Sequence, residues 1–305
     1  MKRKKIGTSL GWLAVSIVLL RLITVFWESC PDGNTLCGIL LGLTLPKFFA
    51  SIQDILDTTT WKTSQRKLGR GKFINNNTPI RISFAYLFRI VVDGKYFLVK
   101  NSRGTGKFQP VGGVYQMNDA EALYLRQKFH VEQDTKIPMN RFSKGDYRLR
   151  IKNRQLRKFV KRFDQTTDRE TVQNLRREFR EELISTGLLR DPVFGTLTYM
   201  YCGRHFAGPS FSDHFQCYEL LMADIVELEL TAAQEERFRE LMQTQSERYC
   251  FASSDEIQSL GVQPGSTDLR ETIGDHAKKI LLENADDLIL PKKMRVGPYS
   301  PTDAL

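Results

Sequence analysis

The chain has few of the residues from which metal centres and hydrolytic triads are most often built. It contains four histidines and five cysteines in 305 residues. The histidines, His130, His205, His214 and His276, are scattered without ligand spacing. The cysteines follow no zinc-binding pattern, and no Ser/His/Asp arrangement has a supporting motif. We therefore expect structural roles for these residues and neither a zinc site nor a nucleophilic triad.

Acidic residues are also in the minority. The chain has 35 aspartates and glutamates against 45 lysines and arginines, a net charge of +10. A surplus of this size favours an anionic partner, such as a nucleotide, a nucleic acid or a membrane surface. The length allows one large domain or two modest ones.

Two apolar runs near the N-terminus predict a transmembrane hairpin over residues 1–57. The first, Ile6–Trp27, has the roughly 20 apolar residues that a spanning helix needs. The second runs from Leu36 to about Ile55, after a short polar turn. The sequence after the first run has no small-x-small site at which a signal peptide would be cleaved. A single span with a buried or interfacial second helix remains the other interpretation.

The charges beside these runs predict their orientation. Lys2–Lys5 precede the first run, Lys62, Arg66 and Lys67 follow the second, and the turn between them is acidic. Because basic flanks stay on the cytoplasmic side, we expect a multi-pass inner-membrane protein with both termini cytoplasmic.

The remainder divides into a basic linker at residues 58–77, a folded α/β domain at 78–290 and a tail at 291–305. Within the domain, Ile80–Val99 is typical of two strands around a tight Asp93-Gly94 turn. We expect a helix over Asp119–Phe129. The later elements expected are strands over Val193–Cys202, His214–Ile225 and Phe251–Ile257 and a closing helix over Gly274–Glu283.

Two features in the first half of this domain are candidates for ligand binding. Gly112 and Gly113 form a glycine pair that lets backbone approach a phosphate or a metal ion. A densely basic segment follows, in which Arg148, Arg150 and Arg154 are candidate phosphate ligands. A solvated cationic surface explains the second feature equally well.

The segment Arg177-Glu178-Phe179-Arg180-Glu181-Glu182 carries three carboxylates at helical positions i, i+3 and i+4. Such positions lie on one helix face, so Glu178, Glu181 and Glu182 are predicted to converge. Convergent carboxylates suit Mg²⁺, which prefers oxygen ligands. The alternative is a solvated helix of mixed charge.

This glycine loop and glutamate helix resemble the box of the Nudix family, with Gly113 as the opening glycine and Arg177–Glu182 as the helix half. The resemblance implies a mixed-sheet α/β/α sandwich and a Mg²⁺ ion held by the glutamates. It departs from the pattern in a long insertion at about residues 115–168, in Arg169 where the spaced glutamate belongs, with Glu170 one residue late, and in Ile184 for the closing glycine.

A split Nudix domain behind an apolar hairpin is similar to the membrane-anchored Nudix effectors of bacterial CBASS antiphage systems. That resemblance implies that the domain senses a cyclic oligonucleotide made by a cognate nucleotidyltransferase. It also implies that the hairpin disrupts the membrane, which causes cell death and abortive infection. Because a hairpin of two helices is too small to form a pore alone, we expect the protein to assemble into homo-oligomers on activation.

An enzymatic alternative stays open. The same domain is consistent with a membrane-tethered, Mg²⁺-dependent hydrolase of a nucleoside diphosphate derivative, in which Glu181 would be the catalytic residue. The intact glutamates favour the hydrolase, whereas the broken box and the basic insertion favour the sensor.

Overall fold

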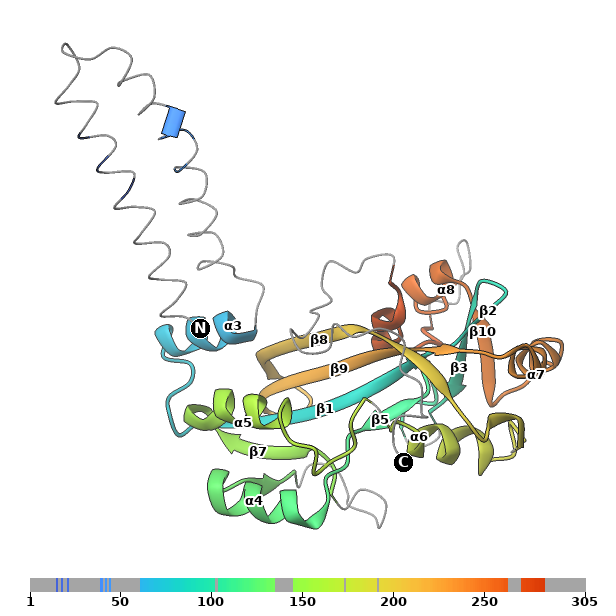
Figure 1. Ribbon diagram of the computed structural model, residues 1–305, viewed down its shortest axis with the longest axis horizontal. Coiled ribbons are helices and arrows are strands. Elements are labelled where there is room, and N and C mark those ends of the chain that lie inside the picture. Colours follow the sequence, from blue (N-terminus) through green and yellow to red (C-terminus); the bar gives the residue numbers. More distant parts are fainter. Residues whose placement is uncertain are drawn as a thin grey trace. The chain divides into compact units, whose positions relative to one another are not determined.

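The structure is a computed structural model (Figure 1). It describes residues 61–101, 104–134, 145–172, 174–190, 192–262 and 270–282, with single positions 15, 18, 21, 39, 40, 42 and 44. The chain divides into two compact units, residues 1–64 and 65–305. Every strand that the structure describes belongs to the second unit.

Among the described residues, no helix combines the length and the apolar character that crossing a bilayer requires. This finding contradicts the predicted transmembrane hairpin over residues 1–57 and the multi-pass inner-membrane placement with both termini cytoplasmic. Apart from the single positions given above, residues 1–57 lie outside the described part of the chain. The segment expected to be a linker contains a helix, α3 (Trp61–Arg70).

The main sheet has six described strands in the order β6-β7-β1-β9-β8, with β5 also beside β1. β1 and β9 run parallel and the other pairs run antiparallel. The sheet is therefore mixed, as a Nudix-type α/β domain requires. Its strands are β1 (Pro79–Arg89), β5 (Gly112–Val114), β6 (Glu132–Gln133), β7 (Arg148–Lys152), β8 (Thr198–Ser212) and β9 (Cys217–Glu229).

Two short strands share one edge of β1. β7 pairs with Pro79–Ser83, and β5 pairs with Ala85–Leu87. β5 carries the glycine pair, whereas β7 belongs to the inserted segment. The insertion therefore adds a strand, β7, to the edge of β1 that β5 leaves unpaired. Figure 1 shows β1, β9 and β8 side by side, with β7, α4 and α5 at one end and β10 and α7 at the other.

A smaller sheet follows the order β10-β3-β2, with β4 beside β3. Its strands are β2 (Val91–Val92), β3 (Lys95–Lys100), β4 (Phe108–Gln109) and β10 (Tyr249–Ala252). The β2–β3 turn places Asp93 at φ 47° and Gly94 at φ 74°. Two left-handed residues are what a tight two-residue hairpin needs, so the predicted Asp93-Gly94 turn is confirmed.

The helices are mostly short. After α3, the α-helices that the structure describes are α4 (Asp119–Phe129), α5 (Leu156–Phe163), α6 (Arg177–Phe179), α7 (Ala232–Met242) and α8 (Ser254–Gln258). Of these, α4 has the bounds predicted from the sequence. Asn118 Oδ1 accepts the Glu121 N–H at its start, and His130 is left-handed at its end. The irregular helices are η1 (Asn153–Gln155), η2 (Arg180–Ile184), η3 (Pro192–Phe194) and η4 (Asp275–Ile280).

Aromatic side chains cover one face of the main sheet. The ring of Phe84 on β1 lies 4.9 Å from that of Phe163 on α5, and Phe88 lies 5.9 Å from Phe179 on α6. The other face is covered by β3, β10, α8 and η4, which pack on Leu87 and Ile225. Strands thus form part of that layer, so the layers differ from the expected α/β/α sandwich.

A buried ion pair fastens the insertion to the sheet. Asp224 on β9 accepts hydrogen bonds from Arg204 Nε at 2.6 Å and from the Tyr115 hydroxyl at 2.7 Å. Arg204 Nη1 also binds Asp164 Oδ1 at 2.6 Å, just after α5. Because Asp224 is fully buried, these donors must compensate its lost hydration. The insertion is therefore part of the domain core.

Candidate functional site

The two halves of the split glycine–glutamate box meet in space. After β5, Gln116 and Glu170 bind each other twice. The Glu170 N–H donates to the Gln116 carbonyl at 2.8 Å, and the Gln116 N–H donates to Glu170 Oε2 at 2.8 Å. Met117 and Arg169 form an antiparallel bridge. The inserted chain therefore leaves and returns at adjacent points, and the glycine loop faces the glutamate helix.

The glycine pair packs against the glutamates. A Cβ at Gly113 would lie 1.9 Å from Glu178 Oε1, and a Cβ at Gly112 would lie 2.3 Å from the Tyr86 carbonyl. The Gly112 N–H donates to Glu182 Oε2 at 3.3 Å. Only glycine allows this approach. Both predicted glycines thus lie at the box, where they contact protein carboxylates; their role in binding a ligand stays a prediction.

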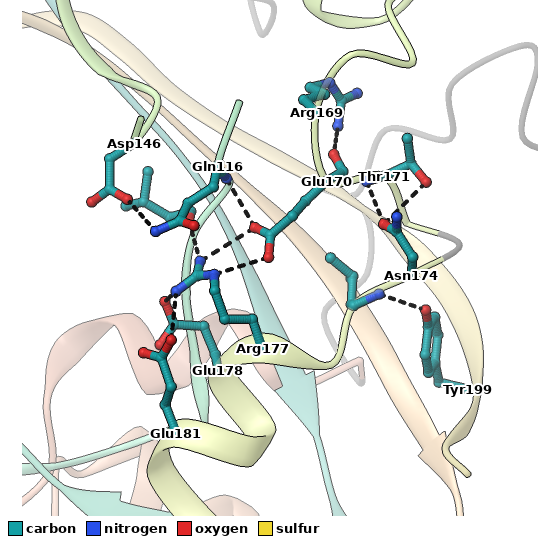
Figure 2. A network of polar contacts seen from close by, with 12 residues as sticks. Gln116, Asp146, Arg169, Glu170, Thr171, Asn174, Arg177, Glu178, Glu181 and Tyr199 are labelled. Atoms are coloured by element: carbon teal, nitrogen blue, oxygen red, sulfur yellow. Dashed lines mark hydrogen bonds and ion pairs between the residues drawn. The ribbon is translucent and has the colours of Figure 1, made fainter. Parts of the chain in front are cut away.

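Arg177 occupies the centre of the box (Figure 2). Its Nη1 lies 2.6 Å from Glu178 Oε1 and 3.7 Å from Glu181 Oε1. Its Nε donates to Glu170 Oε1 at 2.9 Å, and its Nη2 donates to the Val114 carbonyl at 2.8 Å. One guanidinium therefore engages three carboxylates and a strand carbonyl.

These contacts shift the titration of the groups concerned. Burial alone lowers the pKa of Arg177, but the hydrogen bond to Glu170 and the charges of Glu178 and Glu170 outweigh it and raise the pKa. Burial raises the pKa of Glu178, and the charge of Arg177 opposes that rise. The arginine therefore remains a fixed positive charge inside an acidic cluster.

Glu170 is a site residue that stands one position after the place where the Nudix pattern has its spaced glutamate. Arg169, at the position of the spaced glutamate, turns into the core. It donates to the Phe163 carbonyl at 2.8 Å, and its guanidinium lies 3.6 Å from the centre of the Phe163 ring. Glu170 then points to Arg177. Side chains alternate between the two faces of an extended segment, so the sequence could have indicated that Glu170 points to the opposite side from Arg169.

Tyr86 is a second residue that the sequence did not reveal. It pairs with Gly113 in the sheet, and its side chain is fully buried. Its hydroxyl has no hydrogen-bond partner among the residues described. Burial raises its pKa, and the charge of Glu170 adds to the rise. The floor of the box is therefore an uncharged phenol.

The carboxylates do not fit a divalent ion in this arrangement. Across the described ranges, no three His, Cys, Asp or Glu side chains gather in a group able to hold a metal. Arg177 engages Glu178 and Glu181, and Glu182 is bound by a backbone N–H. One cause is the passage from α6 into a π-helical turn at Arg180–Ile184, because a π turn changes which residues share a face. The metal role of Glu178, Glu181 and Glu182 stays a prediction.

The candidate phosphate ligands lie on β7 and beyond it. Arg148 and Arg150 share one strand face, two residues apart. Arg148 Nη1 lies 3.3 Å from Asp146 Oδ2. The other carboxylate oxygen of Asp146, Oδ1, accepts a hydrogen bond from the side-chain amide of Gln116 at 3.4 Å. Arg150 Nε is buried and finds no partner in the described part of the chain, and Arg154 is exposed on η1. The structure therefore brings Arg148 and Arg150 to one face and places Arg154 beyond the end of β7.

The mixed sheet and the rejoined glycine–glutamate box together define a Nudix-type α/β domain. The chain belongs to the family of the SMODS-associated NUDIX domain, which its residues 79–281 match. A search among curated proteins finds no match. The SMODS association suggests a CBASS-type effector role, and Nudix domains generally use Mg²⁺ or similar divalent ions.

Proposed function

We propose that this domain is the sensing part of a CBASS-type antiviral effector and that it binds a cyclic oligonucleotide without hydrolysing it. The observation that carries this proposal is the position of Arg177. Its guanidinium engages Glu178 and Glu181, the carboxylates that would otherwise hold a metal ion. With those groups neutralised internally, the fold retains its shape but lacks a ready centre for water attack.

The charge of the chain supports a ligand of this class. A cyclic oligonucleotide carries several phosphodiesters and so presents closely spaced negative charges. The net charge of +10 attracts such a ligand. Arginine binds phosphate oxygens through paired N–H groups, which suits the basic segment around Arg148, Arg150 and Arg154. A cognate nucleotidyltransferase would supply the ligand, and binding would favour a homo-oligomeric state of the effector.

Binding calorimetry on the purified full chain tests the proposal. The ligands are a panel of cyclic di- and trinucleotides, with the corresponding linear mononucleotides as controls. We expect saturable binding of at least one cyclic ligand, its recovery intact by chromatography, and a rise in mass by light scattering. Absence of binding to every cyclic ligand, or recovery of hydrolysed ligand, contradicts the proposal.

One observation favours a second candidate, a divalent-ion-dependent hydrolase of a nucleoside diphosphate derivative. The base of the insertion rejoins the two halves of the box, as hydrolysis would need. The test is product formation from such derivatives with Mg²⁺ or Mn²⁺. In that case Glu181→Gln should abolish turnover, whereas Glu240→Gln at an exposed position of helix α7 should not. Turnover that survives Glu181→Gln excludes Glu181 as the catalytic residue, and absence of turnover in the wild type excludes the hydrolase.

A further inference from the structure

A surface rich in cations forms where the end of α3 and the turn after it meet η1 and α5. The side-chain amide of Gln65 donates to the Asn153 carbonyl at 3.1 Å, and the side-chain amide of Asn153 donates to the Asn75 carbonyl at 2.9 Å. Residues 65–78 and 153–163 therefore lie against each other, and we call their shared surface the α3–α5 surface.

Neither of these two segments contains an aspartate or a glutamate. Their nine cations are Arg66, Lys67, Arg70, Lys72, Arg154, Arg157, Lys158, Lys161 and Arg162. Because the net charge of the whole chain is +10, the rest of the chain is close to electroneutral. All of these cations except Arg66 and Arg162 are exposed. A local concentration of exposed positive charge of this kind attracts a polyanion.

An exposed aromatic ring belongs to the same surface. Phe73 is 68% exposed, more than any other large apolar side chain that the structure describes. Its N–H donates to the Leu68 carbonyl at 3.0 Å, and Lys72 before it takes the left-handed conformation at φ 59°. The ring lies against the backbone of Gly71, where a Cβ would come within 2.6 Å of two ring carbons. The ring is therefore supported on one side and presents the rest of its surface to solvent.

Single-stranded nucleic acid is the polyanion that uses both features. Its bases stack on aromatic side chains, and its phosphates bind the cations around them. Stacking would also remove the exposed part of the Phe73 ring from water. A duplex offers the same phosphates but keeps its bases stacked on one another, so it gains nothing from the ring.

A membrane surface fits the α3–α5 surface less well. Anionic lipids attract cations too, but interfacial binding needs a face of several apolar side chains that enter the headgroup layer. Residues 65–78 and 153–163 are described throughout, and Phe73 is the only exposed large apolar side chain among them. The positive charge thus far exceeds the apolar area that could enter lipid.

We propose that the α3–α5 surface binds single-stranded nucleic acid, with one base stacked on Phe73 and the backbone phosphates on the cations of α3 and α5. Arg70 and Lys72 stand beside the ring in the chain, and Lys158 continues the positive charge along α5. Stacking and phosphate contacts do not read the edges of bases, so binding has little sequence preference. This activity goes beyond the sensing of a cyclic oligonucleotide and does not depend on it.

Fluorescence anisotropy with the purified full chain tests the role of the ring. The probe is a labelled oligothymidylate of about 20 nucleotides, long enough for one such surface. Phe73→Ala should weaken its binding about 5- to 150-fold, the usual loss for one stacked base. Phe211→Ala is the matched control, because Phe211 is a half-exposed ring on β8, and it should bind as the wild type does. The duplex of the same oligonucleotide should be insensitive to Phe73→Ala.

A salt titration tests the role of the charges. The logarithm of the affinity falls with the logarithm of the salt concentration, with a slope of roughly 0.7 for each phosphate of a single strand that is neutralised. Arg70→Gln and Lys158→Gln should each reduce that slope by roughly 0.7. Arg237→Gln, at an exposed position of α7, should leave it unchanged. Phe73→Ala should lower the affinity without changing the slope, since no charge is lost.

Three results would overturn the inference. The first is wild type that does not bind the oligothymidylate. The second is binding that Phe73→Ala, Arg70→Gln and Lys158→Gln all leave unchanged. The third is binding to phosphatidylglycerol vesicles, weakened by Phe73→Ala, without binding to the oligothymidylate, which would assign the surface to lipid.

Melting curves exclude a structural explanation. Phe73, Arg70 and Lys158 are exposed, so the three variants should melt at the temperature of the wild type. A lower melting temperature of Phe73→Ala with unchanged affinity would make the ring structural and overturn its stacking role. None of these outcomes alters the test of cyclic oligonucleotide sensing, which uses different ligands and a different readout.

Discussion

The carboxylate of Glu178 rests on the backbone of Gly113, so closely that a Cβ at residue 113 would lie 1.9 Å from Glu178 Oε1. This contact joins the two halves of a motif that a long insertion separates in the sequence. It also explains why the second glycine of the pair is a glycine.

Gly113→Ala should destabilise the domain by about 1–3 kcal/mol, the usual cost of an added methyl group in a packed site. Glu178 must move, and its bond to Arg177 is disturbed. Urea unfolding measures the change. Gly69→Ala is the matched control, because a Cβ there meets nothing within 4 Å. A Gly113→Ala variant as stable as the wild type would show that the contact is relaxed in solution.

Arg177→Met should cost about 3–5 kcal/mol, the typical loss when one partner of a buried ion pair is removed. It leaves Glu170 and Glu178 as uncompensated, largely buried carboxylates. Arg180→Met in the adjoining π-helical turn η2 is the control, since Arg180 is exposed. Equal unfolding free energies for the two variants would contradict the conclusion that Arg177 holds the carboxylates of the box in place.

Asp146 should make stability fall as the pH rises from about 4 to about 6. Burial, opposed by Arg148 and Gln116, raises the pKa of Asp146 from 3.8 to about 6. The folded state therefore holds the proton more tightly than the unfolded state, and its contribution is full below pH 4 and lost above pH 6. Two units correspond to about 2–3 kcal/mol.

The measurement is the unfolding free energy of wild type minus that of Asp146→Asn, from pH 4 to pH 7.5. The difference should become less favourable to the wild type across this range, because asparagine does not titrate. Asp213→Asn, at an exposed position, provides the control. A difference that stays flat with pH contradicts the raised pKa.

Mn²⁺ or Mg²⁺ should leave the melting temperature of the ligand-free chain unchanged. An ion that bound only the folded state would raise it by mass action. Arg177 and the Gly112 N–H already engage the three glutamates, so no ready site exists among them. A rise of several degrees that Glu181→Gln with Glu182→Gln abolishes would restore the metal site and, with it, the hydrolase candidate.

Local signals in the sequence predicted local structure well. The Asp93-Gly94 turn and helix α4 carry their own determinants, namely a pair of left-handed residues and an asparagine cap. The expected strand at Val193 was wrong at its start, because Pro192–Phe194 forms a 3-10 turn and β8 begins at Thr198. The expected closing helix is the 3-10 helix η4, and the expected strand at Phe251 ends at Ala252 and gives way to α8.

The sequence identified the glycines and glutamates of the site, but it did not predict which side chains contact one another there. The expected face of Glu178, Glu181 and Glu182 assumed an α-helix throughout, and the chain turns into a π-helix at Arg180. Glu170 was one residue from the expected position because a bridge between Met117 and Arg169 fixes which side chain points inward. Such pairings depend on chain segments far apart in sequence, which spacing alone does not encode.

The insertion shares its strand and its core with the rest of the sheet, and this limits how ligand preference can be transplanted. β7 pairs with Pro79–Ser83, and Phe163 packs on Phe84. A chimera that exchanges residues 117–169 between two family members would therefore place a foreign strand and foreign rings against an unmatched β1. A chimera that folds must carry Pro79–Phe84 along with the insertion. Ligand preference can therefore be transferred between family members only when both segments are exchanged together.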